Sequence, residues 1–139
     1  FDRVVVATLH NPQKGAALFD LSERRELIEA SLAHLHNVEV TSFASLVVDL
    51  AKEVEAGFIV KGLRAVSDFE SELQMAQTNT TISGVDTLFI PSASNHSFLA
   101  SKLIREIARF GGDVTAMVPP PVAERLQARF ATSNEETST

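Results

Sequence analysis

The middle of the chain contains the sequence that decides its fold, FIVKGLRAVSDFESELQMA at residues 58–76. Its first three residues are apolar and include β-branched side chains, which predicts a strand at residues 58–60. Ser67 and Glu70 have the spacing of a capping box, and apolar side chains at helical spacing continue to about Asn79. The stretch therefore predicts a strand and then a helix, joined by a loop that carries positive charge.

The same alternation of strand and helix continues on both sides of this stretch. Runs of apolar and β-branched residues predict further strands at residues 4–9, 38–40 and 87–90. Helices are expected after a capping box of Asp20 and Glu23, from about Ser45 to Gly57, from near Ser97 to Gly111 and Gly112, and over residues 122–130. The strand at residues 4–9 is apolar on both faces, which predicts burial on both. Together these elements predict the α/β class with a doubly wound parallel sheet.

Length and composition limit the classes of protein. A chain of 139 residues supports one core, so a single domain is expected over residues 1–130, followed by a disordered tail at residues 131–139. The 12 Lys and Arg residues against 18 Asp and Glu give a net charge of -6, which argues against nucleic acid as a partner. The chain has no cysteine and no apolar run approaching the ~20 residues that cross a bilayer, which predicts a cytoplasmic protein with no membrane partner.

Doubly wound sheets bind ligands beyond the carboxyl ends of their strands, which selects the loops at residues 10–14, 61–64 and 92–102. In the second loop Lys61 and Arg64 flank Gly62. A glycine lets backbone amides approach a ligand, and the two cations attract phosphate. The alternative is that both cations are solvated or pair with acids such as Asp68.

The third loop leads into the helix expected from near Ser97, whose free amides and positive dipole end favour phosphate. Lys102 lies in its first turn, where a cation is unfavourable unless an anion is close. The alternative is a solvent-facing lysine beside an ordinary N-cap serine. His10 and His96 are placed to reach the ligand edge, and the sequence has no Walker-type loop, no G-x-G-x-x-G motif and no metal-ligand spacing.

Taken together, these loops resemble bacterial phosphopantetheine adenylyltransferase over residues 1–130. The most specific part is Lys61-Gly62-Leu63-Arg64 followed by Asp68-Phe69-Glu70-x-Glu72-Leu73-Gln74-Met75-Ala76, which is similar to a family signature of G-L-R, D-F-E and a second Glu. Residues 97–106 resemble the family's second nucleotide motif, I-S-S-T-x-V-R-E. Ala100 replaces a Ser of that motif and Lys102 a Ser or Thr, and His96 stands where Trp or Tyr is usual.

The resemblance implies a Rossmann-like nucleotidyltransferase fold and transfer of AMP from ATP to 4'-phosphopantetheine, giving dephospho-coenzyme A and pyrophosphate with the help of Mg²⁺. It implies that Lys14, Lys61 and Val47 bind phosphopantetheine. For ATP it implies Gly62, Leu63, Arg64, Glu72, His96, Ser97, Phe98, Leu99, Ala100, Ser101 and Lys102. No residue is assigned to the metal. A cytoplasmic homohexamer, with coenzyme A as an inhibitor, is also a family expectation.

No catalytic residue is assigned within the chain. The family's transition-state group is a histidine in a T/H-x-G-H motif, and no histidine here is followed by x-Gly-His. The expectation is that this motif lies upstream of Phe1, that the first βα unit is missing, and that the 139 residues alone are inactive. Two alternatives remain: a sibling nucleotidyltransferase with another substrate, and a non-catalytic protein that binds a nucleotide or coenzyme A.

Overall fold

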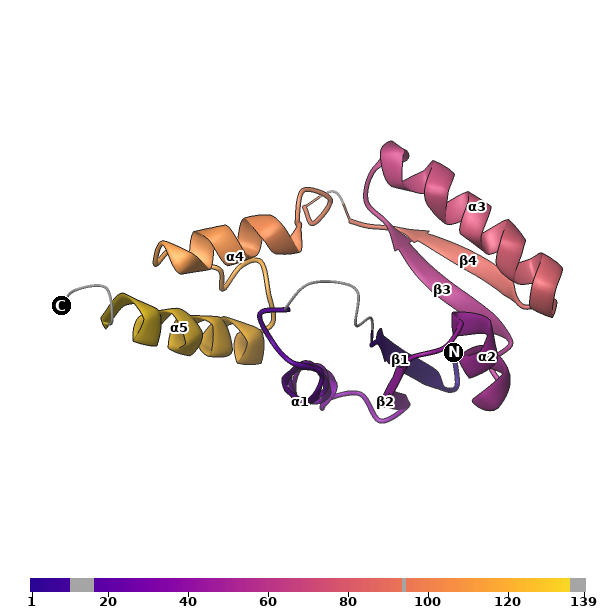
Figure 1. Cartoon of the computed structure of the whole chain (residues 1–139), viewed down its shortest axis with the longest axis horizontal. Helices are drawn as coiled ribbons and strands as arrows, with labels where there is room; N and C mark the ends of the chain where they lie inside the picture. The colour runs from indigo at the N-terminus through magenta and orange to yellow at the C-terminus, as the bar shows by residue number, and fades with distance from the viewer. Residues whose placement is uncertain (11–16, 94, 136–139) are drawn as a thin grey trace. The chain divides into compact units, whose positions relative to one another are not determined.

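The computed structural model describes residues 1–10, 17–93 and 95–135. Strands and helices alternate along it as β1 (Val4–Leu9), α1 (Leu21–Leu32), β2 (Val38–Phe43), α2 (Val47–Glu53), β3 (Phe58–Leu63), α3 (Val66–Ser83), β4 (Asp86–Pro91), α4 (Ser101–Arg109) and α5 (Pro120–Glu135) (Figure 1). This order confirms the predicted α/β class. In the part of the chain that the structure describes, no helix has the length and apolar character needed to cross a membrane.

The chain divides into two units, and each is described by itself. The first comprises Phe1–Thr8, Pro12–Ser42 and Leu99–Thr139, and the second comprises Leu9–Asn11 and Phe43–Phe98. Each unit contains one pair of hydrogen-bonded strands, β1 with β2 and β3 with β4, within the described residues. The prediction of a single domain over residues 1–130 stays a prediction.

In the first unit, β1 and β2 run parallel. The Val4 amide donates to the Asn37 carbonyl at 2.8 Å and the Thr8 hydroxyl donates to the Thr41 carbonyl at 3.3 Å. The residue numbers of the partners increase in the same direction along both strands, as in a parallel pair. The prediction that this strand is buried on both faces is wrong for the described structure, because Val4 is half-buried and Leu9 is exposed. Among the described residues, β1 has only β2 as a paired neighbour.

Helix α1 begins at the predicted capping box. The Glu23 amide donates to Asp20 Oδ1 at 2.8 Å, and the Asp20 amide donates to Glu23 Oε2 at 3.0 Å. Each carboxylate therefore satisfies an amide that the first turn of a helix leaves without an intrahelical partner. The sequence predicts this start correctly because the whole motif spans four consecutive residues.

Helix α5 packs beside α1 and α4 over the core of the first unit (Figure 1). The buried side chains of that core are Ala108, Val114, Ala123 and Leu126. Helix α5 continues to Glu135, beyond the expected end at Phe130. No glycine or proline interrupts the sequence after Phe130, so helix propagation, which is cooperative, carries the chain past the last apolar residue.

In the second unit, β3 and β4 are parallel and in register from Phe58 opposite Asp86 to Leu63 opposite Pro91. Strand β3 is longer than the predicted 58–60, so Lys61, Gly62 and Leu63 belong to β3 itself and not to a loop after it. Helix α3 returns along this pair of strands (Figure 1). Its N-cap is Ala65 without a side-chain cap, so the predicted capping box at Ser67 and Glu70 is wrong.

Helix α2 covers one side of the second unit. Val48 and Ala51 are buried with Ile59 of β3, and Val47 packs against this cluster. The side chains on the opposite face of the strand pair, Phe58, Val60, Leu88 and Ile90, are exposed. Alternation along both strands thus directs one apolar set into the unit's core and the other set away from it.

Candidate functional site

Residues 61–64, which the sequence predicted as a ligand-binding loop, lie at the carboxyl end of β3. Lys61 lies opposite Phe89 of β4, and its Nζ is 3.2 Å from Glu72 Oε2 on α3. The two side chains are 39% and 33% exposed, so the ion pair remains open to solvent and to a ligand. Two residues that the resemblance gives to different substrates are therefore in direct contact.

A second cation and a second carboxylate lie at the same end of the strand. Arg64 Nη2 is 3.9 Å from Asp68 Oδ2, which is in the first turn of α3. A carboxylate there is favoured by the positive end of the helix dipole. The pairing that the sequence offered as an alternative for Arg64 and Asp68 is therefore present, and Lys61 also has a carboxylate partner.

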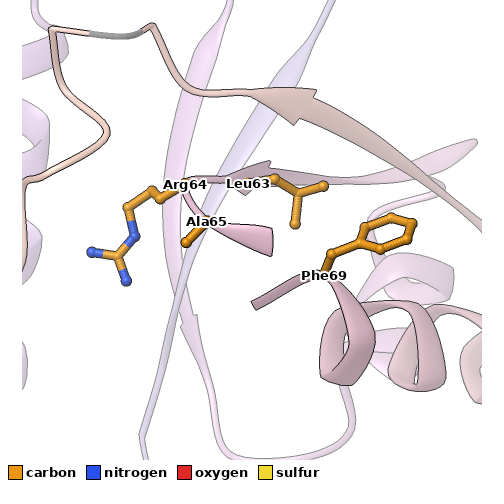
Figure 2. A pocket seen from close by; sticks show the side chains of 4 residues that line it. All are labelled: Leu63, Arg64, Ala65 and Phe69. Atoms are coloured by element: carbon orange, nitrogen blue, oxygen red, sulfur yellow. The ribbon is translucent and has the colours of Figure 1, made fainter. Parts of the chain in front are cut away.

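An open hollow of about 310 Å³ lies beside Arg64. It is lined by Leu63, Arg64, Ala65 and Phe69 (Figure 2). The Phe69 ring meets Phe89 edge to face, with 5.9 Å between the ring centroids, and this contact fixes α3 against β4. In Figure 2 the Arg64 guanidinium extends away from the Phe69 ring, so the hollow has an apolar side and a cationic side.

Gly62 leaves space at the centre of this strand end. A Cβ atom built there would meet no atom within 4 Å, so the backbone at Gly62 is open on the face of the strand that Phe58 and Val60 share with it. This space leaves room for a ligand at the glycine, and contact of Gly62 with ATP stays a prediction. Lys61 and Arg64 flank the glycine in the chain, so two cations lie at this strand end.

Phe69 is the residue of this region for which sequence reasoning gave no contact at the site. Asp68, four residues after Arg64, was named only as a possible ion-pair partner. The T-shaped contact of Phe69 with Phe89 depends on the parallel register of β3 and β4, and no local pattern specifies it.

Residues 96–98, also in the second unit, form an exposed turn. The His96 amide donates to the Ala93 carbonyl at 2.9 Å, and Phe98 is 57% exposed. The prediction that a helix begins near Ser97 is wrong, because α4 begins at Ser101. Contacts of His96, Ser97 and Phe98 with ATP stay predictions.

Leu99, Ala100, Ser101 and Lys102 belong to the first unit. Ala100 is the N-cap of α4, with φ -136° and ψ 139° and no side-chain hydrogen bond, so the expected serine cap is replaced by an alanine that cannot cap. The Ile104 amide donates to the Ala100 carbonyl, and the amides of the first turn of α4 come before it in the chain. Lys102 is exposed in this turn, which agrees with the alternative of a solvent-facing lysine, and its role toward ATP stays a prediction.

Two further predicted phosphopantetheine contacts are Val47 and Lys14. Val47 is the first residue of α2 and half-buried against the Val48 and Ala51 core, so part of its surface is left for a ligand. Lys14 lies outside the described residues. Within residues 1–10, 17–93 and 95–135, no group of three or more His, Asp or Glu side chains is arranged to hold a metal.

Comparison with known proteins adds the family. The family model described as cytidylyltransferase-like matches residues 1–107. A protein of Gloeobacter violaceus named phosphopantetheine adenylyltransferase is 50% identical over 132 residues, which cover 94% of this chain and 81% of that protein. A protein of the same name from a Synechococcus species is 52% identical over 131 residues, covering 94% of this chain and 78% of the relative.

The match to residues 1–107 and the parallel strands define a nucleotidyltransferase with a Rossmann-like fold, as the sequence predicted. Within that class, the chain belongs to the phosphopantetheine adenylyltransferase family.

Proposed function

We propose that the protein transfers AMP from ATP to 4'-phosphopantetheine, forming dephospho-coenzyme A and releasing pyrophosphate, a step of coenzyme A synthesis. The observation that carries the proposal is the pair of cations, Lys61 and Arg64, on either side of the open backbone at Gly62, in a chain half identical to named phosphopantetheine adenylyltransferases. Both substrates bear phosphate, and this strand end is built to receive it.

In this reaction a phosphate oxygen of 4'-phosphopantetheine attacks the α-phosphorus of ATP. The new P–O bond forms as the bond to the β-phosphate oxygen breaks, and pyrophosphate leaves with that electron pair. Lys61, with Lys14 and Val47, holds the acceptor, and the cationic ammonium screens the repulsion between the two anionic substrates. Positioning two phosphates in line and stabilising the charge that develops on them are the main contributions of such a site.

For ATP the proposal relies, in the second unit, on Gly62, Leu63, Arg64 and Glu72, while the contacts of residues 96–102 with ATP stay predictions. The Arg64 guanidinium offers a fork of donors that matches phosphate oxygens, and its long side chain is partly exposed. The hollow beside it, with Leu63 and Phe69 on its apolar side, can receive a flat or apolar part of the nucleotide.

Mg²⁺ is proposed as the metal that accompanies ATP. Mg²⁺ usually keeps several waters and is bound by one or two carboxylates plus substrate phosphates. A described chain without a cluster of three metal-ligating side chains suits an ion held mainly by the triphosphate. When bound, the ion would withdraw charge from the phosphate oxygens, and Asp68 and Glu72 are the carboxylates of this strand end nearest to that role.

Pyrophosphate release from ATP and 4'-phosphopantetheine tests the activity. Lys61→Ala is expected to raise the KM for 4'-phosphopantetheine by about tenfold or more, because a charge-assisted hydrogen bond to phosphate contributes roughly 1.5–3 kcal/mol. Lys52→Ala on α2 removes the same charge from an exposed position and is the matched control. The measurement uses a protein that includes the T/H-x-G-H motif expected upstream of Phe1. Absence of pyrophosphate release in that protein would contradict the proposed reaction, and an unchanged KM in its Lys61→Ala variant would contradict the role of Lys61.

Assembly and regulation are proposed on the same family basis. A homohexamer in the cytoplasm, with coenzyme A as an inhibitor, is the expected form. The absence of cysteine fits a reducing compartment. Sedimentation equilibrium tests the assembly, and a monomeric mass at micromolar concentration would contradict it.

A further inference from the structure

We propose that Glu72 limits occupation of the strand end by small anions: its carboxylate competes with phosphate for the Lys61 ammonium, so that a small free phosphate ion is held weakly. The inference rests on the proposed function in taking phosphate as the ligand of Lys61. It assigns to Glu72 an action through Lys61, which is distinct from a direct contact with ATP.

The geometry that carries this inference is a double pairing between β3 and α3. Lys61 and Glu72 approach to 3.2 Å, and Arg64 and Asp68 to 3.9 Å. Asp68 and Glu72 are four residues apart on α3, so they lie on one face of the helix. That face presents a carboxylate to each cation of the strand end.

The exposed fraction of the four side chains determines the net strength of the two ion pairs. All four side chains are between 33% and 48% exposed, so solvent screens both ion pairs and their net strength is small. A phosphate group can therefore displace the carboxylate from the ammonium. The displacement still carries a cost, because the ammonium loses its carboxylate partner when the phosphate binds.

The consequence differs between ligands of different size. A free phosphate ion has only the cations to bind and bears the whole cost of displacing Glu72. A substrate with a pantetheine arm or a nucleoside has further contacts that offset it. The cost lowers the affinity of both kinds of ligand by the same factor. A free phosphate ion, which binds weakly, then leaves the site mostly empty, whereas a substrate present well above its dissociation constant still fills it.

Direct binding of inorganic phosphate, measured by titration at constant ionic strength, tests the inference without requiring turnover. Glu72→Gln keeps the size of the side chain and removes its charge, and it is expected to tighten phosphate binding about two- to fivefold, the strength of an exposed ion pair. Asp68→Asn is expected to give a smaller gain, because its pair with Arg64 is longer. Glu70→Gln, an exposed position on the same helix, is the matched control and should leave binding unchanged.

A double variant establishes that Glu72 acts through Lys61. In Lys61→Gln the gain from Glu72→Gln should disappear, so that Lys61→Gln and the double variant bind phosphate equally. Weaker or unchanged phosphate binding in Glu72→Gln would overturn the inference, since a carboxylate that only positions the ammonium gives that result. A gain that persists in the Lys61→Gln background would also overturn it.

The phosphate-binding test of Glu72 and the pyrophosphate-release test of the proposed reaction can fail independently. If the protein that includes the motif expected upstream of Phe1 releases pyrophosphate but Glu72→Gln does not tighten phosphate binding, the inference fails and the proposed function stands. If that protein releases no pyrophosphate while the Lys61-dependent gain is observed, the proposed function fails and the competition between Glu72 and phosphate is supported.

Discussion

Glu55 has a left-handed backbone, with φ 55°, at the end of α2. The Ala56 amide donates to the Ala51 carbonyl at 2.8 Å and the Glu55 amide to the Lys52 carbonyl at 3.2 Å, which is the hydrogen-bond pattern of a Schellman motif. Helix α4 ends in the same way, with Gly111 at φ 77° in the position that Glu55 occupies in α2. The sequence placed the end of α2 at Gly57, and the structure moves it to a residue with a Cβ atom.

The ends of α2 and α4 predict changes of opposite sign in the free energy of unfolding. Glu55→Gly should raise the free energy of unfolding by about 0.5–1 kcal/mol, because glycine adopts the left-handed region without the steric cost that a side chain brings. Gly111→Ala should lower it by about 1 kcal/mol for the same reason. Urea denaturation measures both changes, and Glu53→Gly, at the last residue of α2, is a control expected to destabilise. A destabilised Glu55→Gly would contradict the strain at this position.

At the scale of a single element, the start of α1 is fixed by Asp20 and Glu23 alone. Both hydrogen bonds of the capping box are present, and no distant residue is required to form them. The starts of α3 and α4 differ, since each has an alanine N-cap, Ala65 and Ala100, with extended backbone and no side-chain bond. These two starts depend on where the preceding segment ends.

The capping box leads to a stability prediction for α1. Asp20→Ala should lower the free energy of unfolding by about 1 kcal/mol, because it leaves a first-turn amide without its acceptor. Asp20→Asn keeps an acceptor oxygen and should retain most of that stability. Equal stabilities of the Ala and Asn variants, measured by thermal denaturation, would contradict a capping role for Asp20.

At the scale of the whole molecule, three carboxyl groups connect stability to pH. The Asp20 amide and the Arg129 guanidinium hold the pKa of Glu23 below its ordinary value of 4.5, and Arg3 does the same for the pKa of Glu39. The backbone amide and hydroxyl of Thr115 lower the pKa of Asp113 below 3.8. Glu23 also joins α1 to α5, since Arg125 lies 3.5 Å from its Oε1.

These lowered pKa values predict acid sensitivity. A carboxyl group with a lower pKa in the folded protein stabilises it above the unfolded pKa, and that contribution is lost as the pH falls through 4.5 and below. Stability should therefore fall from pH 6 to pH 3, as urea denaturation would measure. Glu23→Gln should be less stable than the parent at pH 6 and lose less on acidification. Glu29→Gln, which removes an ion pair local to α1, should keep the parent's acid dependence.

Local patterns predicted the α/β alternation and the capping box, because each depends on residues close in sequence. They misplaced the starts of α3 and α4. Ser67 and Ser97 would be N-caps only if the segment before each helix ended at that serine, and it does not. Pairing with β4 extends β3 as far as Leu63, and the extended backbone at Ala65 then sets where α3 begins. The serine at position 67 is consequently inside the helix.

The sequence by itself determined the class of fold, the family signature and the cations at Lys61 and Arg64, because strand, helix and phosphate-binding preferences are written in short runs of residues. Only the tertiary structure decided that Lys61 meets Glu72 and that Phe69 meets Phe89, whereas the sequence had already offered the local pair of Arg64 and Asp68 as an alternative. The contacts of Lys61 and Phe69 join β3 or β4 to α3, and the register of the strands together with the packing of the helix fixes them. The competition between carboxylate and phosphate at Lys61 follows from that packing.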